Sequence, residues 1–390
     1  MSGVDATVPR SAEIVIVGAG VVGLSIAFHL AERGATGVVV LERDTVAAGS
    51  TSKATGGIRH QFGDETAVRL SLESIPFFAD FERRTGAPFL FRRHGYLFLV
   101  PEARLDALRH DVALQRRLGV PTELLAPEEV RARWPAIDVD GIAGAGFCAL
   151  DGSGSPTDAA HGFLRAARDR GVQVLEGVAV TGIAVTDGRV VEVETDRGRI
   201  AAGTVVNAAG PWAPLVAGMV EVELPIVVQP RQVFVVSDVA GLPEGFPFTI
   251  DMGTGVYVHR EAGSVLLGGG DRDRAPGYDA TLDWSRFEGV AAAAVRRVPL
   301  LAEARSLSGW CGLRAMTPDE QPILGPVGPA GSWCAAGFSG HGFMHAPAVG
   351  RLMAEWLLDG APRGIDPASL TLDRFGARAE QAPDADRIVF

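Results

Sequence analysis

Three glycines and one acid near the N-terminus have the types and spacing that hold a dinucleotide. Gly18, Gly20 and Gly23 form a G-x-G-x-x-G motif. The first glycine permits a tight turn, the second lets the backbone approach a pyrophosphate, and the third lets a helix pack closely on a strand. Glu42 suits the two hydroxyls of a ribose, and an acid there argues against NADP. The alternative is a glycine turn of another α/β protein, with Glu42 as a surface acid.

These residues need a strand, a turn, a helix and a second strand in that order, and the sequence supplies them. Residues 14–17 are a β-branched run without polar alternation, which is typical of a strand buried on both faces of a parallel sheet. A helical pattern follows over 24–33 and stops at Gly34, and residues 37–41 form a second buried strand that ends at Glu42. This is one βαβ unit, which binds either NAD or FAD.

The rest of the chain predicts a second, mainly antiparallel sheet, followed by a last helix over 346–358 that stops near Gly360. Turn signals lie at residues 187–188 and 197–198. A further buried strand is predicted over 204–206. The other strand-rich pieces are 172–185, 190–200, 232–236, 256–259 and 265–267.

The composition is that of a soluble globular protein, with 390 residues and a net charge of −11. An acidic chain argues against nucleic acid as a partner, because that binding needs clustered Lys and Arg. Cys148, Cys311 and Cys334 show no C-x-x-C spacing, which predicts neither disulfides nor a metal site and fits a reducing cytoplasm. Residues 1–10 lack the apolar core of a signal peptide, and no segment has the roughly 18 consecutive apolar residues of a membrane helix.

Further segments favour FAD. Residues 49–59 (GSTSKATGGIR) resemble the flavin-contacting loop of the D-amino-acid-oxidase-like FAD enzymes, a group that includes sarcosine oxidase, glycine oxidase and dimethylglycine dehydrogenase. Residues 205–212 (VVNAAGPW) are similar to the second FAD segment of that group. The most specific likeness is the C-terminal run made of 312–319 (GLRAMTPD), 322–325 (PILG), 336–343 (AGFSGHGF) and 346–350 (APAVG). The resemblance covers about residues 14–358.

We therefore predict an α/β fold in which a Rossmann-like FAD-binding domain is interleaved with a mainly antiparallel-sheet substrate domain. The nucleotide-binding pieces are split by sheet-rich insertions, so both domains are discontinuous, and the polar end of the chain is expected to be a loose tail. The predicted boundaries are 10–84, 151–217 and 318–375 for the FAD-binding domain, 85–150 and 218–317 for the substrate domain, and 376–390 for the tail.

The resemblance implies that the cofactor contacts all of these motifs. Small residues before the last helix would let backbone N–H groups approach the edge of the flavin where negative charge gathers on reduction. The expected cofactor-binding residues are Gly18, Gly20, Val22, Gly23, Glu42, Arg43, Ser50, Thr51, Ser52, Val180, Ala208, Gly210, Trp212, Gly340, His341, Gly342, Phe343 and Met344.

Four residues are candidates for substrate contact. Arg suits a carboxylate because its planar fork matches the two oxygens. Arg59 matches by resemblance the arginine that holds the substrate carboxylate in sarcosine oxidase, and Arg314 matches that of glycine oxidase and D-amino acid oxidase. The alternative for each is a structural ion pair. Tyr257 and His259 alternate on one face of a predicted strand, where the family often places a tyrosine above the flavin.

Departures from sarcosine oxidase limit what the resemblance carries over. Its clamp lysine corresponds to Met344, and the strand that holds its oxygen-activating lysine reads VLLG at 265–268 here, so neither a sarcosine-like substrate nor the use of oxygen follows. Its covalent flavin cysteine corresponds to Gly312, and Cys311 would point away, so we predict non-covalent FAD.

Together these features predict FAD-dependent oxidation of the C–N bond of a small amino acid or N-substituted amino acid. The amine would lose a hydride to the flavin, water would hydrolyse the imine, and oxygen or another acceptor would reoxidise the flavin. Two alternatives stay open. The chain could be the catalytic subunit of a heteromeric amino-acid dehydrogenase that passes electrons to a partner, or an FAD-binding structural or docking subunit without turnover. A homo- or hetero-oligomer is compatible with each.

Overall fold

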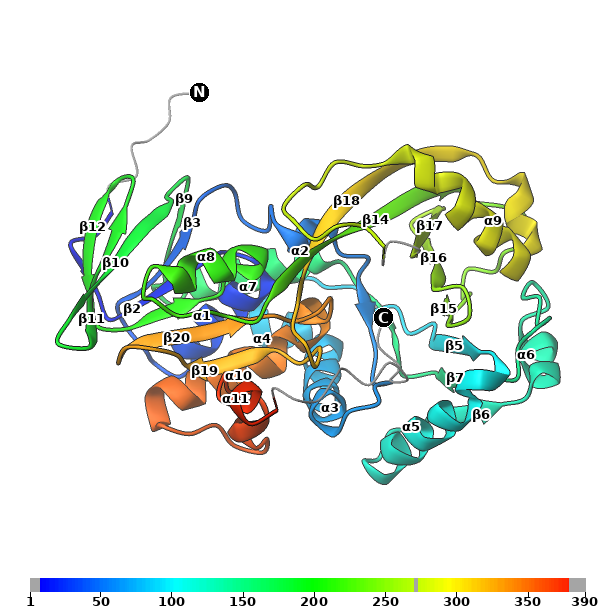
Figure 1. The fold of residues 1–390 in the computed structure, drawn as a ribbon, viewed down its shortest axis with the longest axis horizontal. Helices are drawn as coiled ribbons and strands as arrows, with labels where there is room; N and C mark the ends of the chain where they lie inside the picture. Colours follow the sequence, from blue (N-terminus) through cyan, green and yellow to red (C-terminus); the bar gives the residue numbers. More distant parts are fainter. Residues whose placement is uncertain (1–7, 270–272, 379–390) are drawn as a thin grey trace.

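The computed structural model describes residues 8–269 and 273–378. Its centre is a six-stranded sheet in which all neighbouring strands are parallel except for the edge strand β19. The predicted α/β fold is confirmed. In spatial order the strands are β19 (Ile323–Pro326), β20 (Ser332–Ala336), β13 (Val205–Asn207), β2 (Ile14–Val17), β3 (Val38–Glu42) and β9 (Gln173–Glu176) (Figure 1).

The predicted βαβ unit is present at the middle of this sheet. Strand β2 is buried along its whole length and pairs with β3 in parallel, as expected for strands covered on both faces. Helix α1 (Val21–Glu32) begins earlier than the predicted Leu24, because it starts directly at the glycine turn. Its N-terminus therefore lies at the carboxyl end of β2, which is where ligands of such sheets bind.

A layer of helices covers one face of the six-stranded sheet (Figure 1). Helix α10 (Gly342–Asp359) packs so closely on α1 that a Cβ atom at Gly350 would lie 2.3 Å from Ser25 Oγ, and that hydroxyl donates to Ala346 O at 2.7 Å. Helix α10 begins at Gly342 and not at the predicted residue 346, because it follows the turn at Gly340 directly. The other helices of this layer are α3 (Glu65–Ala79), α4 (Phe81–Thr85) and α7 (Pro156–Arg168).

A four-stranded sheet and α8 (Ala213–Gly218) cover the opposite face. The piece predicted as one unit over 172–185 is divided, because β9 joins the parallel sheet and β10 joins this smaller one. The predicted hairpin turn is present, with Asp187 (φ 49°) and Gly188 (φ 71°) both left-handed. The strands, in spatial order, are β1 (Ser11–Ala12), β12 (Gly198–Ala202), β11 (Arg189–Thr195) and β10 (Val180–Thr186).

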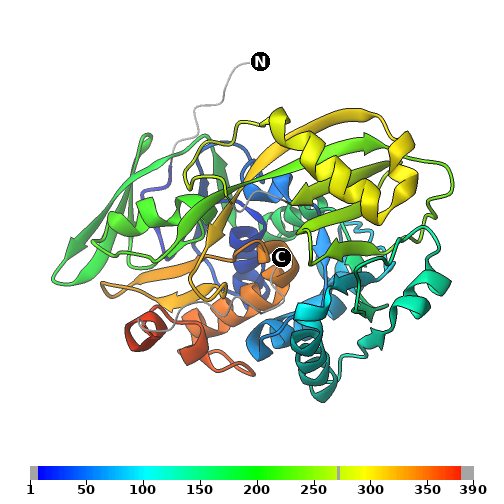
Figure 2. The ribbon, with the colours of Figure 1, turned by 45° about the vertical axis from the view of Figure 1, so that its right-hand side comes forward.

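The second large sheet has eight strands and is antiparallel except for the pair β15–β5. Helix α9 (Phe287–Arg297) packs on one face of it (Figure 2), and α5 (Leu105–Arg117) and α6 (Pro127–Arg133) lie near its far edge. In spatial order the strands are β18 (Ser306–Met316), β14 (Val227–Ser237), β17 (Ser264–Gly269), β16 (Val256–Glu261), β15 (Phe248–Asp251), β5 (Tyr96–Val100), β7 (Gly144–Cys148) and β6 (Glu123–Leu125).

Short elements complete the fold. Helix α2 (Ser50–Lys53) follows β3, and β4 (Gly57–Ile58) pairs with β8 (Gly152–Ser153). The predicted tail over 376–390 begins within helix α11 (Arg374–Arg378), and its remaining residues, 379–390, lie outside the described residues. Among the residues that the structure describes, no helix is long and apolar enough to cross a membrane.

Candidate active site

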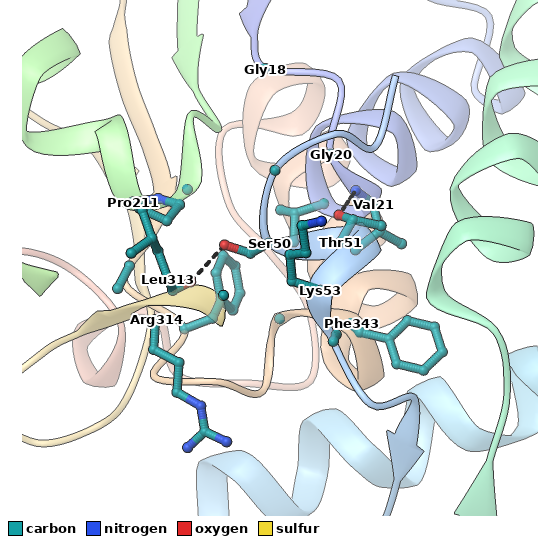
Figure 3. Close-up of a pocket in the computed structure, with 18 of the residues that line it drawn as sticks. Gly18, Gly20, Val21, Ser50, Thr51, Lys53, Pro211, Leu313, Arg314 and Phe343 are labelled. Atoms are coloured by element: carbon teal, nitrogen blue, oxygen red, sulfur yellow. Dashed lines mark hydrogen bonds between the residues drawn. The ribbon is translucent and has the colours of Figure 1, made fainter. Parts of the chain in front are cut away.

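A cavity of about 430 Å³ lies between the carboxyl end of the six-stranded sheet and the eight-stranded sheet. Its wall is built from the glycine turn, α2, the segment 208–212 after β13, strands β14 and β18, and the turn before α10 (Figure 3). Both large sheets therefore contribute to one site, and segments far apart in the sequence meet there.

The three glycines of the motif have three different surroundings. Gly18 is left-handed (φ 107°), and a Cβ atom there would lie 2.6 Å from Ala208 O. A Cβ atom at Gly23 would lie 2.1 Å from Gly18 O, so this position permits only close packing and does not line the cavity. A Cβ atom at Gly20 would meet only Thr51 Oγ1, at 3.3 Å, so its bare α-carbon faces the cavity. These are the roles that the motif predicts.

Glu42 closes the end of the cavity beside the glycine turn. Its carboxylate accepts hydrogen bonds from Ala19 N and Asp44 N, both at 2.9 Å, and each oxygen keeps a further lone pair for another donor. Next to it the Arg43 guanidinium lies 3.9 Å from the centre of the Trp212 ring, a cation–π contact. The carboxylate is thus held in place at the carboxyl end of β3, where a ribose would lie.

Helix α2 links the glycine turn to the eight-stranded sheet. Thr51 Oγ1 accepts from Val21 N (3.1 Å), and Ser50 Oγ donates to Leu313 O (2.7 Å), as Figure 3 shows. Trp310 Nε1 donates to Lys53 O (2.9 Å), and the Lys53 side chain lines the cavity. Lys53 is a cation of the site that the sequence analysis did not single out, because one lysine in a polar loop is unremarkable.

Arg59 is buried in the cavity wall, with a relative exposure of 2%. Its guanidinium donates to Gln61 O (2.5 Å) and to His341 Nε2 (3.2 Å), and it lies 4.1 Å from the centre of the Phe62 ring. Burial lowers the pKa of Arg59 to about 10, and the positive charge of Arg314 adds to this lowering. Arg59 is still a cation at neutral pH, and the positive charge of Arg314, which lines the same cavity, repels it.

A buried polar cluster anchors the segment that follows Arg59. His60 N and Nδ1 contact Asp151 Oδ1 at 2.9 and 2.7 Å, and Gln61 Nε2 donates to Asp151 Oδ2 at 3.2 Å. Cys148 lies within the same cluster, and burial raises the pKa of its thiol well above the ordinary range. Because the thiol stays protonated and the Asp151 oxygens already accept hydrogen bonds, we assign this cluster a structural role.

Arg314 extends from β18 and lines the cavity (Figure 3). It is half-buried and lies opposite Gln229 of β14. Arg59 and Arg314 are separated by most of the sequence, yet both residues line one cavity, and the charge of Arg314 acts on Arg59. Like charges at one site repel each other, and an anion between them relieves that repulsion.

Aromatic side chains form the apolar wall of the cavity. Tyr96 and Phe248 stack with ring centres 4.3 Å apart, and Tyr257 lies 5.4 Å from Phe248. All three line the cavity, and burial raises the pKa of Tyr96 above its ordinary value, so its hydroxyl stays neutral. Tyr257 was a sequence-based candidate, whereas Tyr96 and Phe248 were not, because they lie in ordinary apolar strands.

The structure places His259 outside the cavity, contrary to the prediction of a substrate contact. Its ring stacks on Phe248 (4.4 Å), and its Nε2 lies 2.9 Å from Glu261 Oε2. Tyr257 and His259 both contact Phe248, which agrees with the predicted shared face of β16. Alternation in a strand gives the face of a side chain and not its distance from a site, and here only Tyr257 reaches the cavity.

The predicted cofactor residues divide into two groups. Ser52 is exposed with its hydroxyl turned to backbone carbonyls, Gly23 packs against Gly18, and His341 lies behind Arg59, so these three do not line the cavity. Those that line it are Gly18, Gly20, Val22, Glu42, Arg43, Ser50, Thr51, Val180, Ala208, Gly210, Trp212, Gly340, Gly342, Phe343 and Met344.

The fold and this cavity define a class of flavoenzyme. The profile of the family described as FAD dependent oxidoreductase matches residues 13–356, and the chain belongs to that family.

Two relatives and one solved structure are similar to this chain over nearly its whole length. Mitochondrial sarcosine dehydrogenase of Mus musculus is 30% identical over 384 residues, which are 94% of this chain and 42% of that protein. The 4-methylaminobutanoate oxidase (formaldehyde-forming) of Paenarthrobacter nicotinovorans is 28% identical over 379 residues, which are 94% of this chain and 46% of that protein. The chain thus spans less than half the length of these relatives. The crystal structure of L-proline dehydrogenase from P. horikoshii superposes with a TM-score of 0.89 at 32% identity and covers 95% of this chain and 99% of that one.

The residues of the cavity fit FAD. The open side of Gly20, the Thr51 hydroxyl and the N-terminus of α1 suit a pyrophosphate, because they offer space, a polar contact and a positive dipole end. Glu42 suits the ribose. The region between β18 and the turn before α10 offers apolar walls and small residues, so the flavin ring can approach the backbone there.

Acid or heat denaturation of the FAD-loaded protein should release all the flavin and leave colourless protein. None of the described residues that line the cavity is a cysteine or a histidine, and Cys311 contacts Gly312 O and Arg274 Nη1 instead. Absorbance spectra of the supernatant and of the redissolved precipitate measure the two fractions. A precipitate that stays yellow would contradict non-covalent binding.

Proposed function

We propose that this chain uses FAD to oxidise the C–N bond of a small amino acid or N-substituted amino acid whose carboxylate is held by Arg59 and Arg314. The observation that carries the proposal is the pair of arginines on one cavity that also contains the glycine turn. Two guanidinium groups offer a planar, multiple-donor site of the kind that binds a carboxylate.

The charges around the cavity support an anionic substrate. The chain as a whole is acidic, with a net charge of −11, yet the cavity is lined mainly by cations among its charged residues. The acids of the lining, Glu42 and Asp44, both lie at the end beside the glycine turn. The charged lining residues are Arg43, Lys53, Arg59, Arg231, Arg314, Glu42 and Asp44.

The three proteins compared above support an amine substrate, and the compounds in their names favour a secondary amine. Sarcosine, L-proline and 4-methylaminobutanoate, the compounds in their names, are all secondary amines that carry a carboxylate. The L-proline dehydrogenase is matched over nearly its whole length, so the compound in its name is our guide to the size of the substrate. We infer that this chain acts on an N-alkylated or cyclic amino acid of similar size.

The chain's own residues would bind, orient and shield such a substrate. Arg59 and Arg314 fix the carboxylate, which sets the position of the α-carbon, and Tyr96, Tyr257 and Phe248 exclude water from the site. FAD, when bound, supplies the acceptor for the hydride equivalent of the C–H bond. No histidine lines the described part of the cavity, so we propose that the substrate reacts as the neutral amine, without a strong protein base.

Two other functions compete with this one. In the first, a partner subunit accepts the electrons of the reduced flavin, and the relatives include dehydrogenases as well as an oxidase. A docking subunit without turnover would need a site that no longer binds substrate, and the two cavity arginines favour an active enzyme.

Anaerobic titration with matched pairs of compounds should bleach the flavin only when a carboxylate is present. We expect proline and sarcosine to reduce it, whereas pyrrolidine and dimethylamine, which lack the carboxylate, should fail at the same concentration. Absorbance of the oxidised flavin is the readout, and peroxide formed after oxygen is admitted separates an oxidase from a dehydrogenase. Equal reduction by the amines, or no reduction by any amino acid in either enantiomer, would refute the proposed function.

A further inference from the structure

The turn that precedes α10 is fixed to the strand that carries Arg314. Ser339 N donates to Ala315 O (2.8 Å), and Ser339 Oγ accepts from Thr317 N (3.2 Å). Ser339 is buried and has a left-handed backbone (φ 50°), which is uncommon for a residue other than glycine. The next two residues, Gly340 and His341, therefore have defined positions relative to β18.

Gly340 lies against the side chain of Arg314. A Cβ atom at Gly340 would be 3.0 Å from Arg314 Nε, 3.1 Å from Cζ and 3.2 Å from Cδ. These separations are shorter than an ordinary van der Waals contact between such atoms. With a side chain at residue 340, the guanidinium group of Arg314 would have to shift by a few tenths of an ångström.

His341 contacts the other arginine. A guanidinium group can only donate, so the 3.2 Å contact between Arg59 and His341 Nε2 makes that nitrogen the acceptor and places the imidazole proton on Nδ1. His341 is buried and does not line the cavity, and its ring meets Phe62 edge-on at 5.0 Å, the same ring that lies under Arg59. His341 thus fixes the position of Arg59 without lining the cavity itself.

We propose that Gly340 and His341 are positioning residues for the carboxylate site. One two-residue segment sets the place of both cavity arginines, Gly340 by leaving room for Arg314 and His341 by accepting a hydrogen bond from Arg59. This rests on the proposed function, because it assigns the two arginines to the substrate carboxylate. The sequence predicted that both residues contact the cofactor, and we assign them instead to positioning the two arginines that bind the substrate.

The test measures the binding of acetate and propionate to the FAD-loaded protein, through the change in flavin absorbance, together with FAD content. His341→Leu removes the acceptor and should raise the dissociation constant of propionate by about tenfold, with FAD content unchanged. His341→Gln offers an amide oxygen at a similar reach and should restore most of the affinity. Combined with Arg59→Ala, His341→Leu should cause no further loss.

Gly340→Ala has a matched control in Gly360→Ala. Both glycines are left-handed (φ 96° and 84°), but a Cβ atom at Gly360 meets nothing within 4 Å. Both variants therefore carry the backbone strain, and only Gly340→Ala displaces Arg314. We expect Gly340→Ala to weaken propionate binding and to raise KM more than it lowers kcat, whereas Gly360→Ala should bind propionate like the wild type.

The outcomes separate this proposal from the proposed function. A wild-type protein that binds no carboxylate would refute the proposed function. Wild-type binding that depends on Arg314 but is unchanged in His341→Leu and Gly340→Ala would overturn the positioning roles alone. If His341→Leu and His341→Gln both lost FAD or failed to fold, His341 would belong to the core or the cofactor site, and its positioning role would be overturned. Gly340→Ala would then test the positioning role of Gly340 alone.

Discussion

Replacing Arg314 with alanine should lower kcat/KM for the amino-acid substrate by about 10² to 10³. The physical reason is that the substrate carboxylate would enter a partly desolvated cavity without its main partner, which costs on the order of 3–5 kcal/mol for a buried pair. FAD content should hardly change, because the predicted cofactor contacts lie on other residues. Stopped-flow measurement of flavin reduction against substrate concentration gives both the affinity and the rate.

Two further variants show whether the effect comes from a two-point contact. Arg314→Lys should recover only part of the loss, because an ammonium group cannot reproduce the planar fork. Arg59→Ala should cause a comparable loss, and the double variant should be non-additive, because both arginines would bind one carboxylate. If Arg314→Ala reduced at the wild-type rate and affinity, the carboxylate would bind elsewhere or the substrate would carry none.

Gly20→Val should give a folded protein that binds FAD about 10- to 100-fold more weakly, which corresponds to the usual 1–3 kcal/mol cost of overfilling a packed site. Gly20 has an extended backbone (φ −73°, ψ 173°) that any residue adopts, and its Cβ direction meets only Thr51 Oγ1 at 3.3 Å. The fold therefore tolerates a side chain there, whereas the cavity does not. Flavin absorbance of the purified protein and the melting temperature measure the two effects separately.

Two other glycines serve as controls. Gly23→Ala should lower the melting temperature strongly, because its Cβ atom would lie 2.1 Å from Gly18 O. Gly34→Ala places a side chain in open space at a left-handed position (φ 85°), so it should cost some stability and leave FAD binding unchanged. A Gly20→Val protein that is purified with a full complement of FAD would show that the cofactor does not approach this turn.

The parts of the fold that local sequence determines were predicted well. Buried β-branched residues and the glycine motif are sufficient for β2, α1 and β3, because the strand run and the turn chemistry act over a few neighbouring residues. The start of α10 was missed because it depends on the turn at Gly340, whose conformation is set by contacts with β18. The division of residues 172–185 between two sheets likewise depends on tertiary pairing.

Residues of the site could be predicted where a sequence motif identifies them. They could not be predicted where only the packing of distant strands brings them into the cavity. Gly20 and Glu42 follow from the dinucleotide motif, and the arginine pair followed from the family resemblance. Tyr96 and Phe248 look like core residues in the sequence, and only the pairing of β5 with β15 brings their rings together. His259 was misplaced because strand alternation gives its face and not its distance from the site: its ring stacks on Phe248, which lines the cavity, and His259 itself does not line it.

The contact between α1 and α10 has a consequence for how the chain acquires its structure. The hydroxyl of Ser25 donates to Ala346 O, across 321 residues of sequence, and Gly350 packs on the same turn of α1. During synthesis the ribosome releases α1 long before α10 exists, so the side of α1 that faces α10 stays uncovered for most of translation. Such long-range pairing slows folding, because a large loop must close before the contact forms. Helix α1 is therefore among the first segments to be made and among the last to reach its final packing.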